Sequence, residues 1–270
     1  RTQPDPVDYS SPALLGKLIY SLNASHQFGL TLDAQRRTQD TEVYSARAVP
    51  PLAASSALDL RAHDRLERSR VSLEHRYADP TGAWVQKAET RVYAQDAEVS
   101  QFAAEDRNTS ADRTRDNRYR QNVRGASALL ESNFGGAMDH RLSYGLDLSR
   151  TEITGVRDGT VPPFGETFPT KPFPNTRYTL AGVFVQDEIE AGQFSVIPGL
   201  RFDHYKLAPS SKGYTGGEAV TLSDQAVTPR LGAVWRLNPA FTPYAQWAQG
   251  FRAPTPDQVN NGFTNLASFY

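Results

Sequence analysis

The stretch Arg-Leu-Ser-Tyr-Gly-Leu-Asp-Leu-Ser-Arg at Arg141–Arg150 decides the fold class of this chain. Apolar side chains occupy every second position from Leu142 to Leu148, and most positions between them are polar or charged. Successive side chains of a strand point to opposite faces, so this alternation indicates a β-strand with one apolar and one polar face. The same pattern recurs in three further segments, Gln27–Arg37, Phe194–Tyr205 and Arg230–Leu237.

The length and charge of these strands indicate a membrane. About ten such stretches run for about 10 to 14 residues, whereas a tilted membrane strand needs about 9 to 11 and a globular strand about 5 to 6. An unpaired charge in a dry core costs several kcal/mol, so the polar face fits a wet lumen better. The lumen would be lined by Arg141, Asp147, Arg201, Asp203, Arg230 and Arg236. The pattern predicts an all-β, antiparallel transmembrane β-barrel, with a large soluble β-sandwich or β-solenoid as the alternative.

The connections between these strands alternate in expected length. Short turns are expected near Ala24–Gln27, Asp79–Gly82, Phe134–Asp139, Glu190–Gln193 and Asn238–Ala240. Long polar connections are expected at Thr38–His63, Glu98–Asn117, Glu152–Thr176 and Leu207–Asp224. Outer-membrane barrels have short periplasmic turns and long extracellular loops. The long connections would therefore form the side that meets a ligand.

Composition excludes several other classes. The 270-residue chain has a formal net charge of −1, which gives no support to a nucleic-acid partner. It has no Cys, so disulfides and thiolate metal sites are excluded. Mean hydropathy is −0.54, yet a barrel keeps a polar average while it contacts outer-membrane lipid, because only alternate residues face the lipid.

Both ends of the chain are expected to be loops. The amino-terminal residues contain Pro4, Pro6 and Pro12 and show no signal-peptide pattern, and Asn261–Tyr270 carries no strand pattern. The chain is expected to be an internal piece of a longer polypeptide.

The carboxyl-terminal residues resemble a known family. The stretch Phe251-Arg252-Ala253-Pro254, together with Thr228–Gly232 and Gly199–Asp203, resembles TonB-dependent outer-membrane receptors, and specifically their haem and haemoprotein branch. The resemblance implies a 22-stranded barrel closed by an amino-terminal plug. Residues 1–270 would then be a partial barrel domain, without the plug and the remaining strands.

The resemblance also implies a function and a location. The chain would belong to a receptor in the outer membrane of a Gram-negative bacterium that imports haem from haemoproteins with energy from the TonB complex, which acts through the plug. Haem would be the transported ligand, and no cofactor would be bound permanently. Ferric siderophores are the alternative cargo, and a passive porin or adhesin-like barrel is the alternative class. An enzyme is not expected, because no nucleophile, base and orienting residue form a recognisable set.

Two groups of residues are candidates for ligand contact. The first is the motif itself, Phe251, Arg252, Ala253 and Pro254, which would lie at the outer rim at the end of an ascending strand Phe241–Phe251. The second is a Pro-rich loop with Phe164, Phe168 and Phe173, whose rings would either contact the ligand or pack the loop. Haem iron accepts His or Tyr as an axial ligand, which makes His63 and Tyr270 candidates. A lone loop His is more often a solvated surface residue, and the alternative for Tyr270 is a loop aromatic without a ligand.

Overall fold

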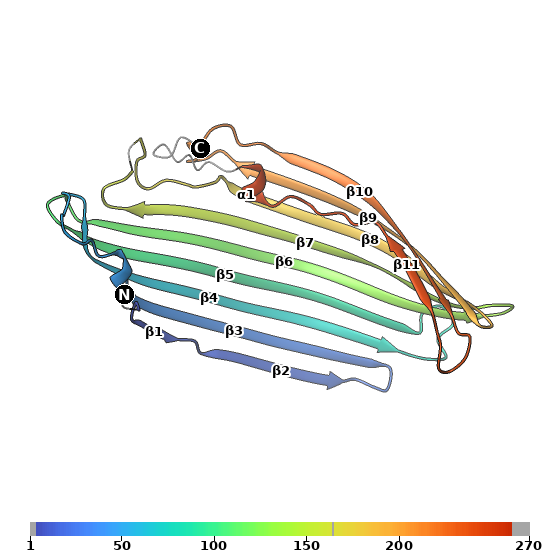
Figure 1. The fold of residues 1–270 in the computed structure, drawn as a ribbon. Coiled ribbons are helices and arrows are strands. Elements are labelled where there is room, and N and C mark those ends of the chain that lie inside the picture. The colour runs from blue at the N-terminus through green and yellow to red at the C-terminus, as the bar shows by residue number, and fades with distance from the viewer. Residues whose placement is uncertain (1–3, 164, 261–270) are drawn as a thin grey trace.

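One antiparallel sheet contains all the strands of the described residues. The computed structural model describes residues 4–163 and 165–260, and eleven strands join in the order β1-β3-β4-β5-β6-β7-β8-β9-β10-β11, with β2 also paired to β3 (Figure 1). The predicted all-β antiparallel fold is therefore confirmed. Among these residues, no helix is long and apolar enough to cross a membrane.

The strands differ widely in length. Two short helical segments accompany them, a 3-10 turn at Tyr44–Ala46 and α1 at Pro256–Val259. The strands are β1 (Val7–Ser10), β2 (Ala13–Ser21), β3 (His26–Glu42), β4 (Ala57–Ala78), β5 (Lys87–Arg107), β6 (Arg113–Gly135), β7 (Asp139–Gly159), β8 (Asn175–Ala191), β9 (Phe194–Ser210), β10 (Leu222–Trp235) and β11 (Tyr244–Ala248).

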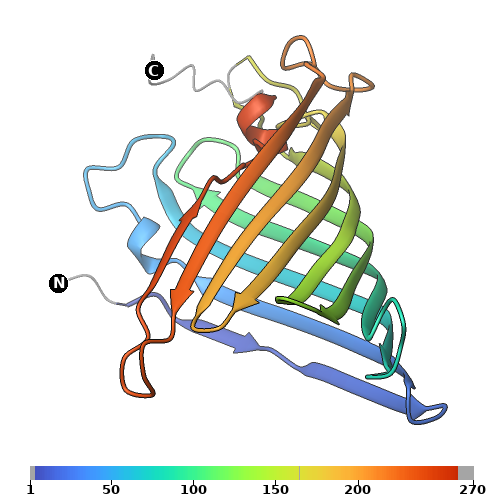
Figure 2. The same ribbon diagram turned by 90° about the vertical axis from the view of Figure 1, so that its right-hand side faces the viewer.

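The sheet curves into a trough with a concave and a convex face (Figure 2). The margins of the trough are β1 with β2 on one side and β11 on the other, and no pairing joins these margins among the described residues. The shape is that of a barrel wall that has not closed, as the partial barrel predicted from the sequence requires.

Register separates an apolar face from a charged one. Leu30 pairs with Leu73, and Leu73 with Val92, so these side chains share one face. Leu73 is 49% exposed and Val92 52%, because nothing in the described part of the chain covers this convex face. Apolar side chains left open to solvent in this way fit contact with lipid. On β8, which is apolar on both faces near Ala181–Val185, Val183 faces outward because it pairs with the outward-facing Leu146.

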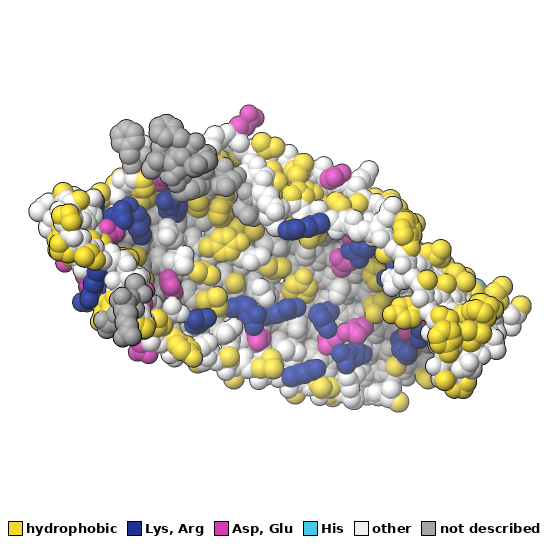
Figure 3. Space-filling view, in the orientation of Figure 1, with side chains coloured by type: hydrophobic (Ala, Val, Ile, Leu, Met, Phe, Trp, Pro, Cys, Tyr) yellow, Lys and Arg dark blue, Asp and Glu magenta, His cyan; other side chains and the backbone are white. Residues whose placement is uncertain are grey.

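The concave face carries the charges predicted for the lumen. Figure 3 shows Lys and Arg side chains along the hollowed face, with acidic side chains between them. Arg201 lies 2.8 Å from Asp147 and 2.6 Å from Asp203, Arg141 pairs with Glu188, and Arg236 lies 3.1 Å from Glu190. Arg230 extends along the space left by Gly199, where a Cβ would lie 2.7 Å from its Nε.

The strands are longer than predicted. From β3 to β10 they contain 14 to 23 residues, so the outer connections shrink to 43–56, 108–112, 160–174 and 211–221. The prediction of a long loop at Glu98–Asn117 was wrong, because β5 and β6 remain paired as far as Glu105 and Arg113. Polar residues keep the two-residue alternation beyond the apolar band, and backbone hydrogen bonds hold the pairing there.

The prediction that the amino-terminal residues form a loop was also wrong in part. β1 and β2 both pair with β3, so they form one broken edge strand. The break falls at Ser11 and Pro12, where proline has no N–H to donate, although its carbonyl still accepts from Arg36 N at 3.0 Å. The two strands occupy one position across the sheet, which leaves the ten positions that the sequence predicts.

The predicted turns lie at the opposite end of the sheet from the connections 43–56, 108–112, 160–174 and 211–221. The predicted turn at Asp79 forms, since Gly82 N donates to Asp79 O at 3.1 Å and Thr81 N donates to the Asp79 carboxylate at 2.9 Å. Hydrogen bonds from Thr81 lower the pKa of this carboxyl. At Asn238 the backbone carbonyl accepts from Phe241 N at 3.1 Å, which closes the predicted Asn-Pro turn.

Candidate functional site

A cluster of arginines lies on the concave face at the outer end of β6 and β7, and we call Arg113, Arg115 and Arg157 the mouth cluster. Arg113 and Arg115 are two residues apart on β6 and share a face. Asn117 continues that face and pairs with Arg157 of β7, which brings the third guanidinium alongside. The cluster thus depends on the strand geometry of a region that the sequence analysis assigned to a loop.

The carboxylates near the mouth cluster do not neutralise it. Arg113 Nε lies 2.6 Å from Glu105 Oε2, and Arg157 Nη1 lies 3.5 Å from Glu166 Oε2. Arg115 instead donates to three backbone carbonyls, those of Thr114 at 2.8 Å, Thr160 at 2.7 Å and Val161 at 3.1 Å. Among the described residues, Arg113 and Arg157 each have an ion pair with one carboxylate, and Arg115 has an ion pair with none.

Burial and charge repulsion both act on Arg115. Desolvation lowers the pKa of Arg115, and the positive charges of Arg113 and Arg157 lower it further. An anion bound beside this guanidinium would relieve both effects, because an opposite charge favours the charged form. Nearby, Arg107 Nε and Asn117 Oδ1 are buried without a hydrogen-bond partner in the described part of the chain.

The loop between β7 and β8 places two predicted aromatic residues near this cluster. The guanidinium carbon of Arg115 lies 5.2 Å from the centre of the Phe168 ring, within cation–π range. Phe173 packs edge-to-face on Tyr119 with ring centres 6.0 Å apart. It also covers Gly155, where a Cβ would lie only 2.7 Å from its ring. Phe168 therefore joins the mouth cluster, whereas Phe173 anchors the loop to the wall.

The loop has a second anchor in its backbone. Arg157 N donates to Thr170 O and Thr170 N to Arg157 O, each at 2.8 Å, which forms an isolated antiparallel bridge. The loop is thus fixed on both sides of Phe168. After Phe168 the bridge at Thr170 holds it, and before Phe168 Arg115 binds the carbonyls of Thr160 and Val161. Phe164 and Tyr270, also predicted as ligand contacts, lie outside the described residues.

The motif Phe251–Pro254 follows the last strand as irregular chain. The predicted strand Phe241–Phe251 was too long, since β11 covers only Tyr244–Ala248. Pairing with β10 ends at Pro229, whose carbonyl accepts from Gln249 N at 3.1 Å. Phe251, Ala253 and Pro254 are half-buried and Arg252 is exposed. Among the described residues, no hydrogen bond or ion pair joins Arg252 to the mouth cluster.

The chain after this motif reaches the outer end of the sheet. The side chain of Asn260 is buried, accepts from Val220 N at 2.7 Å and donates to Val220 O at 2.9 Å. Val220 belongs to the outer connection between β9 and β10, so α1 and Asn260 lie at the mouth side. This position fits the prediction that the chain after β11 runs toward the outer rim. Contact of the motif Phe251–Pro254 with a ligand stays a prediction.

His63 is on the opposite face from the mouth cluster. It lies within β4 and not at the end of a loop, and it pairs with Asp40 of β3. Both positions have the parity of Leu73 and Leu30, so they face outward, and His63 Nδ1 lies 2.7 Å from Asp40 Oδ1. This placement gives His63 no access to a ligand in the lumen.

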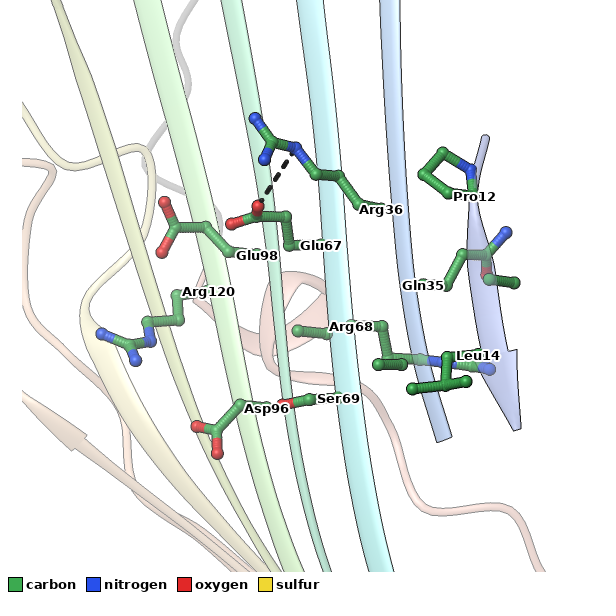
Figure 4. Close-up of a pocket in the computed structure, with 13 residues that line it drawn as sticks. Pro12, Leu14, Gln35, Arg36, Glu67, Arg68, Ser69, Asp96, Glu98 and Arg120 are labelled. Carbon is green, nitrogen blue, oxygen red and sulfur yellow. Dashed lines mark ion pairs between the residues drawn. The ribbon is translucent and has the colours of Figure 1, made fainter. Parts of the chain in front are cut away.

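A hollow of about 520 Å³ also lies on the outward face and not at the mouth. In Figure 4, Arg36 reaches Glu67 at 3.5 Å, with Glu98 and Arg120 beside them. Small residues, including Ala34 and Ser69, leave the space open. Basic and acidic side chains balance here, so the hollow offers no charge preference for a ligand.

Comparison with known proteins agrees with the strand arrangement. A family model described as "TonB dependent receptor-like, beta-barrel" matches residues 8–270. The chain belongs to this family. TonB-dependent receptor barrels are transport receptors of the outer membrane of Gram-negative bacteria, which agrees with the location predicted from the sequence. No match to this TonB-dependent receptor barrel was found among curated proteins.

Solved receptors share the fold at low sequence identity. The ferric citrate transporter FecA is 18% identical with a TM-score of 0.60, and the alignment covers 88% of this chain and 35% of FecA. The ferric preacinetobactin receptor BauA from Acinetobacter baumannii is 11% identical (TM-score 0.55; 90% of this chain, 39% of BauA). The ferric-catecholate import receptor Fiu from E. coli K12 is 13% identical (TM-score 0.56; 90% and 47%). The chain spans less than half of each receptor.

Proposed function

We propose that this chain forms part of the wall and mouth of a receptor that takes up an anionic iron complex through its lumen. The observation that carries the proposal is Arg115, a partly buried guanidinium at the mouth with no carboxylate partner among the described residues. Arginine binds carboxylates through paired, charge-assisted hydrogen bonds. Ferric chelates built on carboxylates, hydroxy acids or catecholates carry negative charge and fit such a group.

The surroundings of Arg115 add an apolar contact. Phe168 covers one side of the guanidinium, and the bridge at Thr170 holds the loop in place. A planar or ring-containing ligand would stack on Phe168 while its anionic groups meet Arg115 and Arg113. The solved receptors FecA, BauA and Fiu, whose names refer to ferric citrate, ferric preacinetobactin and ferric catecholate, support a ferric siderophore or similar chelate as cargo.

Haem is the second candidate cargo, and the resemblance of Phe251–Pro254 to the haem branch favours it. The two propionates of haem would meet the mouth cluster, and the porphyrin would lie against Phe168. His63 faces outward, away from a haem at the mouth cluster, and Tyr270 lies outside the described residues. Uptake of either cargo would use TonB energy through a plug, as the resemblance implies.

Growth on defined iron sources tests the proposal and separates the cargoes. A strain lacking this receptor would be supplied with haem, ferric citrate or a ferric catecholate as its sole iron source, with and without the full-length receptor gene. Restored growth on one source, lost again when the TonB complex is removed, is the expected result. Growth that persists without the TonB complex would indicate a passive porin, and no dependence on any source would contradict the proposal.

A further inference from the structure

The convex face carries a second group of basic residues, directly beyond its apolar band. We call Arg124 of β6, Arg150 of β7, Arg177 of β8 and Lys206 of β9 the outer patch. Arg124 pairs with Arg150, Arg150 pairs with Thr179, and Thr179 pairs with Lys206, so one row of the sheet carries three of the four cations. Arg177 lies beside this row, opposite Glu152.

The outer patch has one carboxylate for four cations. Glu152 Oε1 lies 2.9 Å from Arg150 Nη2 and 3.4 Å from Arg177 Nε, so the two arginines share it. In the described part of the chain, neither Arg124 nor Lys206 has an ion pair. Like charges directly opposite on neighbouring strands are destabilising. The pairing of Arg124 with Arg150 therefore leaves a position between them that an anion would stabilise.

The rows below the patch are mostly apolar and face lipid. Ala126, Leu148, Ala181 and His204 form the next row on the same face, and Ala128, Leu146, Val183 and Phe202 form the row after that. Two residues of a strand rise by about 6 to 7 Å, so the cations stand at the edge of the hydrocarbon. Basic side chains placed there without neutralisation weaken a barrel in a manner that grows with depth.

We propose that the outer patch binds the phosphate groups of a phosphorylated glycolipid in the outer leaflet of the membrane. Its acyl chains would lie on the apolar rows over the small side chains of Ala126 and Ala181. From Arg124 to Lys206 the patch crosses three strand spacings, about 14 Å, which is wide enough for two phosphate groups on one sugar headgroup. The proposal rests on the outer-membrane location of the family and is independent of the cargo.

The charge balance elsewhere on the convex face points to a lipid and not to general surface polarity. Around β3 to β6, Arg36, Arg65 and Arg120 are interspersed with Glu67, Asp96 and Glu98. Farther from the band, Arg118 is held by Asp116 at 2.7 Å and Arg61 by Asp59 at 3.1 Å. Excess positive charge thus gathers on β6 to β9, where the cations border the lipid.

The test compares lipid binding by two doubly substituted full-length receptors. One carries Arg124→Gln and Arg150→Gln, and the control carries Arg61→Gln and Arg118→Gln, which remove the same charge from the same face. Each receptor, purified in detergent, is titrated with diphosphoryl lipid A and with its dephosphorylated form. Native mass spectrometry measures the bound fraction, and the shift in gel mobility on heating confirms that each barrel is folded.

The wild-type receptor and the control are expected to bind diphosphoryl lipid A about tenfold or more tightly than the patch variant. Dephosphorylated lipid should bind all three alike, and millimolar inorganic phosphate should not displace the lipid from the wild type. Equal binding of diphosphoryl lipid by the patch variant and the control would overturn the proposal. Displacement by inorganic phosphate would also overturn it, because the patch would then be a site for a free anion. Should the patch variant misfold, Arg150→Lys, which keeps the charge, must bind as the wild type does.

Discussion

Arginines on the same concave face are held in two different ways, and the difference separates structural from binding residues. In the middle of the wall, Arg201 lies between the carboxylates of Asp147 and Asp203. At the mouth, Arg115 is held by the carbonyls of Thr114, Thr160 and Val161. Both guanidinium groups are fixed in place, but only Arg201 is neutralised.

Carbonyl oxygens position a guanidinium while leaving its net charge available. Burial of that charge has a cost, which appears as the lowered pKa of Arg115, and the neighbouring Arg113 and Arg157 add to the cost. In the middle of the wall, Arg201 is satisfied by two carboxylates within the chain, so a ligand gains little by approaching it. An anion therefore gains more from binding beside Arg115 at the mouth than beside Arg201 in the wall.

The largest expected effect comes from removing the charge at the mouth. Arg115→Gln should weaken binding of the iron complex by about ten- to hundredfold, because a charge-assisted hydrogen bond contributes about 1.5 to 3 kcal/mol. Equilibrium titration of the purified full-length receptor, with the iron source that supports growth, measures the change. Arg118→Gln, on the same strand but facing outward, is the matched control and should bind as the wild type does.

Arg115 also holds the backbone of Thr160 and Val161, so a second variant separates charge from loop position. Arg115→Lys keeps the positive charge but loses the planar fork that reaches several carbonyls. It is expected to recover most of the lost affinity. Equal losses in the Lys and Gln variants would show that Arg115 acts by positioning the loop and not by attracting the anion.

Substitution of the two loop aromatics, Phe168 and Phe173, is expected to have smaller effects on ligand binding. Phe168→Leu should weaken binding by about two- to fivefold without loosening the loop, because it removes the ring over Arg115. Phe173→Leu should instead speed cleavage of the loop 160–174 by added protease, because Phe173 packs on Tyr119 and Gly155. Titration and limited proteolysis of the same two preparations check both statements. The reverse pattern, with Phe173 controlling affinity and Phe168 controlling cleavage, would exchange their assigned roles.

Much of the wall could be predicted from the sequence, because two-residue alternation is local information. The faces of Arg141–Arg150 and of Arg201 with Asp203 were predicted correctly, and the tight turn at Asp79 forms as its residue types require. The alternation weakens where both faces are polar. The outer ends of β5 and β6 were consequently assigned to a loop, although backbone pairing extends them to Glu105 and Arg113.

The mouth cluster could not be predicted for the same reason. Arg113 and Arg115 share a face only if they are in a strand, and their proximity to Arg157 depends on the register of β6 with β7. Register follows from pairing over the whole strand and from the tight turn at the inner end. A spacing of two residues between basic side chains, in a polar stretch next to a strand, was the signal available in the sequence.

Removing a carboxylate from the mouth should strengthen binding. Glu105 Oε2 lies 2.6 Å from Arg113 Nε, and Glu105→Gln leaves a side chain of the same shape without the charge. We expect an increase of about threefold in affinity for the iron complex, since a partly exposed pair is worth about 0.2 to 1 kcal/mol. The gain should shrink at high salt, because the added potential is screened. A fall in affinity, with the same unfolding temperature, would mean that Glu105 orients Arg113 for the ligand.

The smallest effect on binding is expected in the wall. Arg201→Gln should leave affinity for the iron complex at the cell surface within about twofold of wild type, because the pair is satisfied inside the chain and surface ligands meet the mouth first. Its effect should appear in stability, since Asp147 and Asp203 would lose their common partner. The temperature at which the gel mobility of the purified receptor changes should fall, and adding Asp147→Asn should restore part of it. Loss of surface binding at normal receptor abundance would show that the wall takes part in ligand capture, and the distinction between paired and carbonyl-held arginines would no longer separate structure from binding.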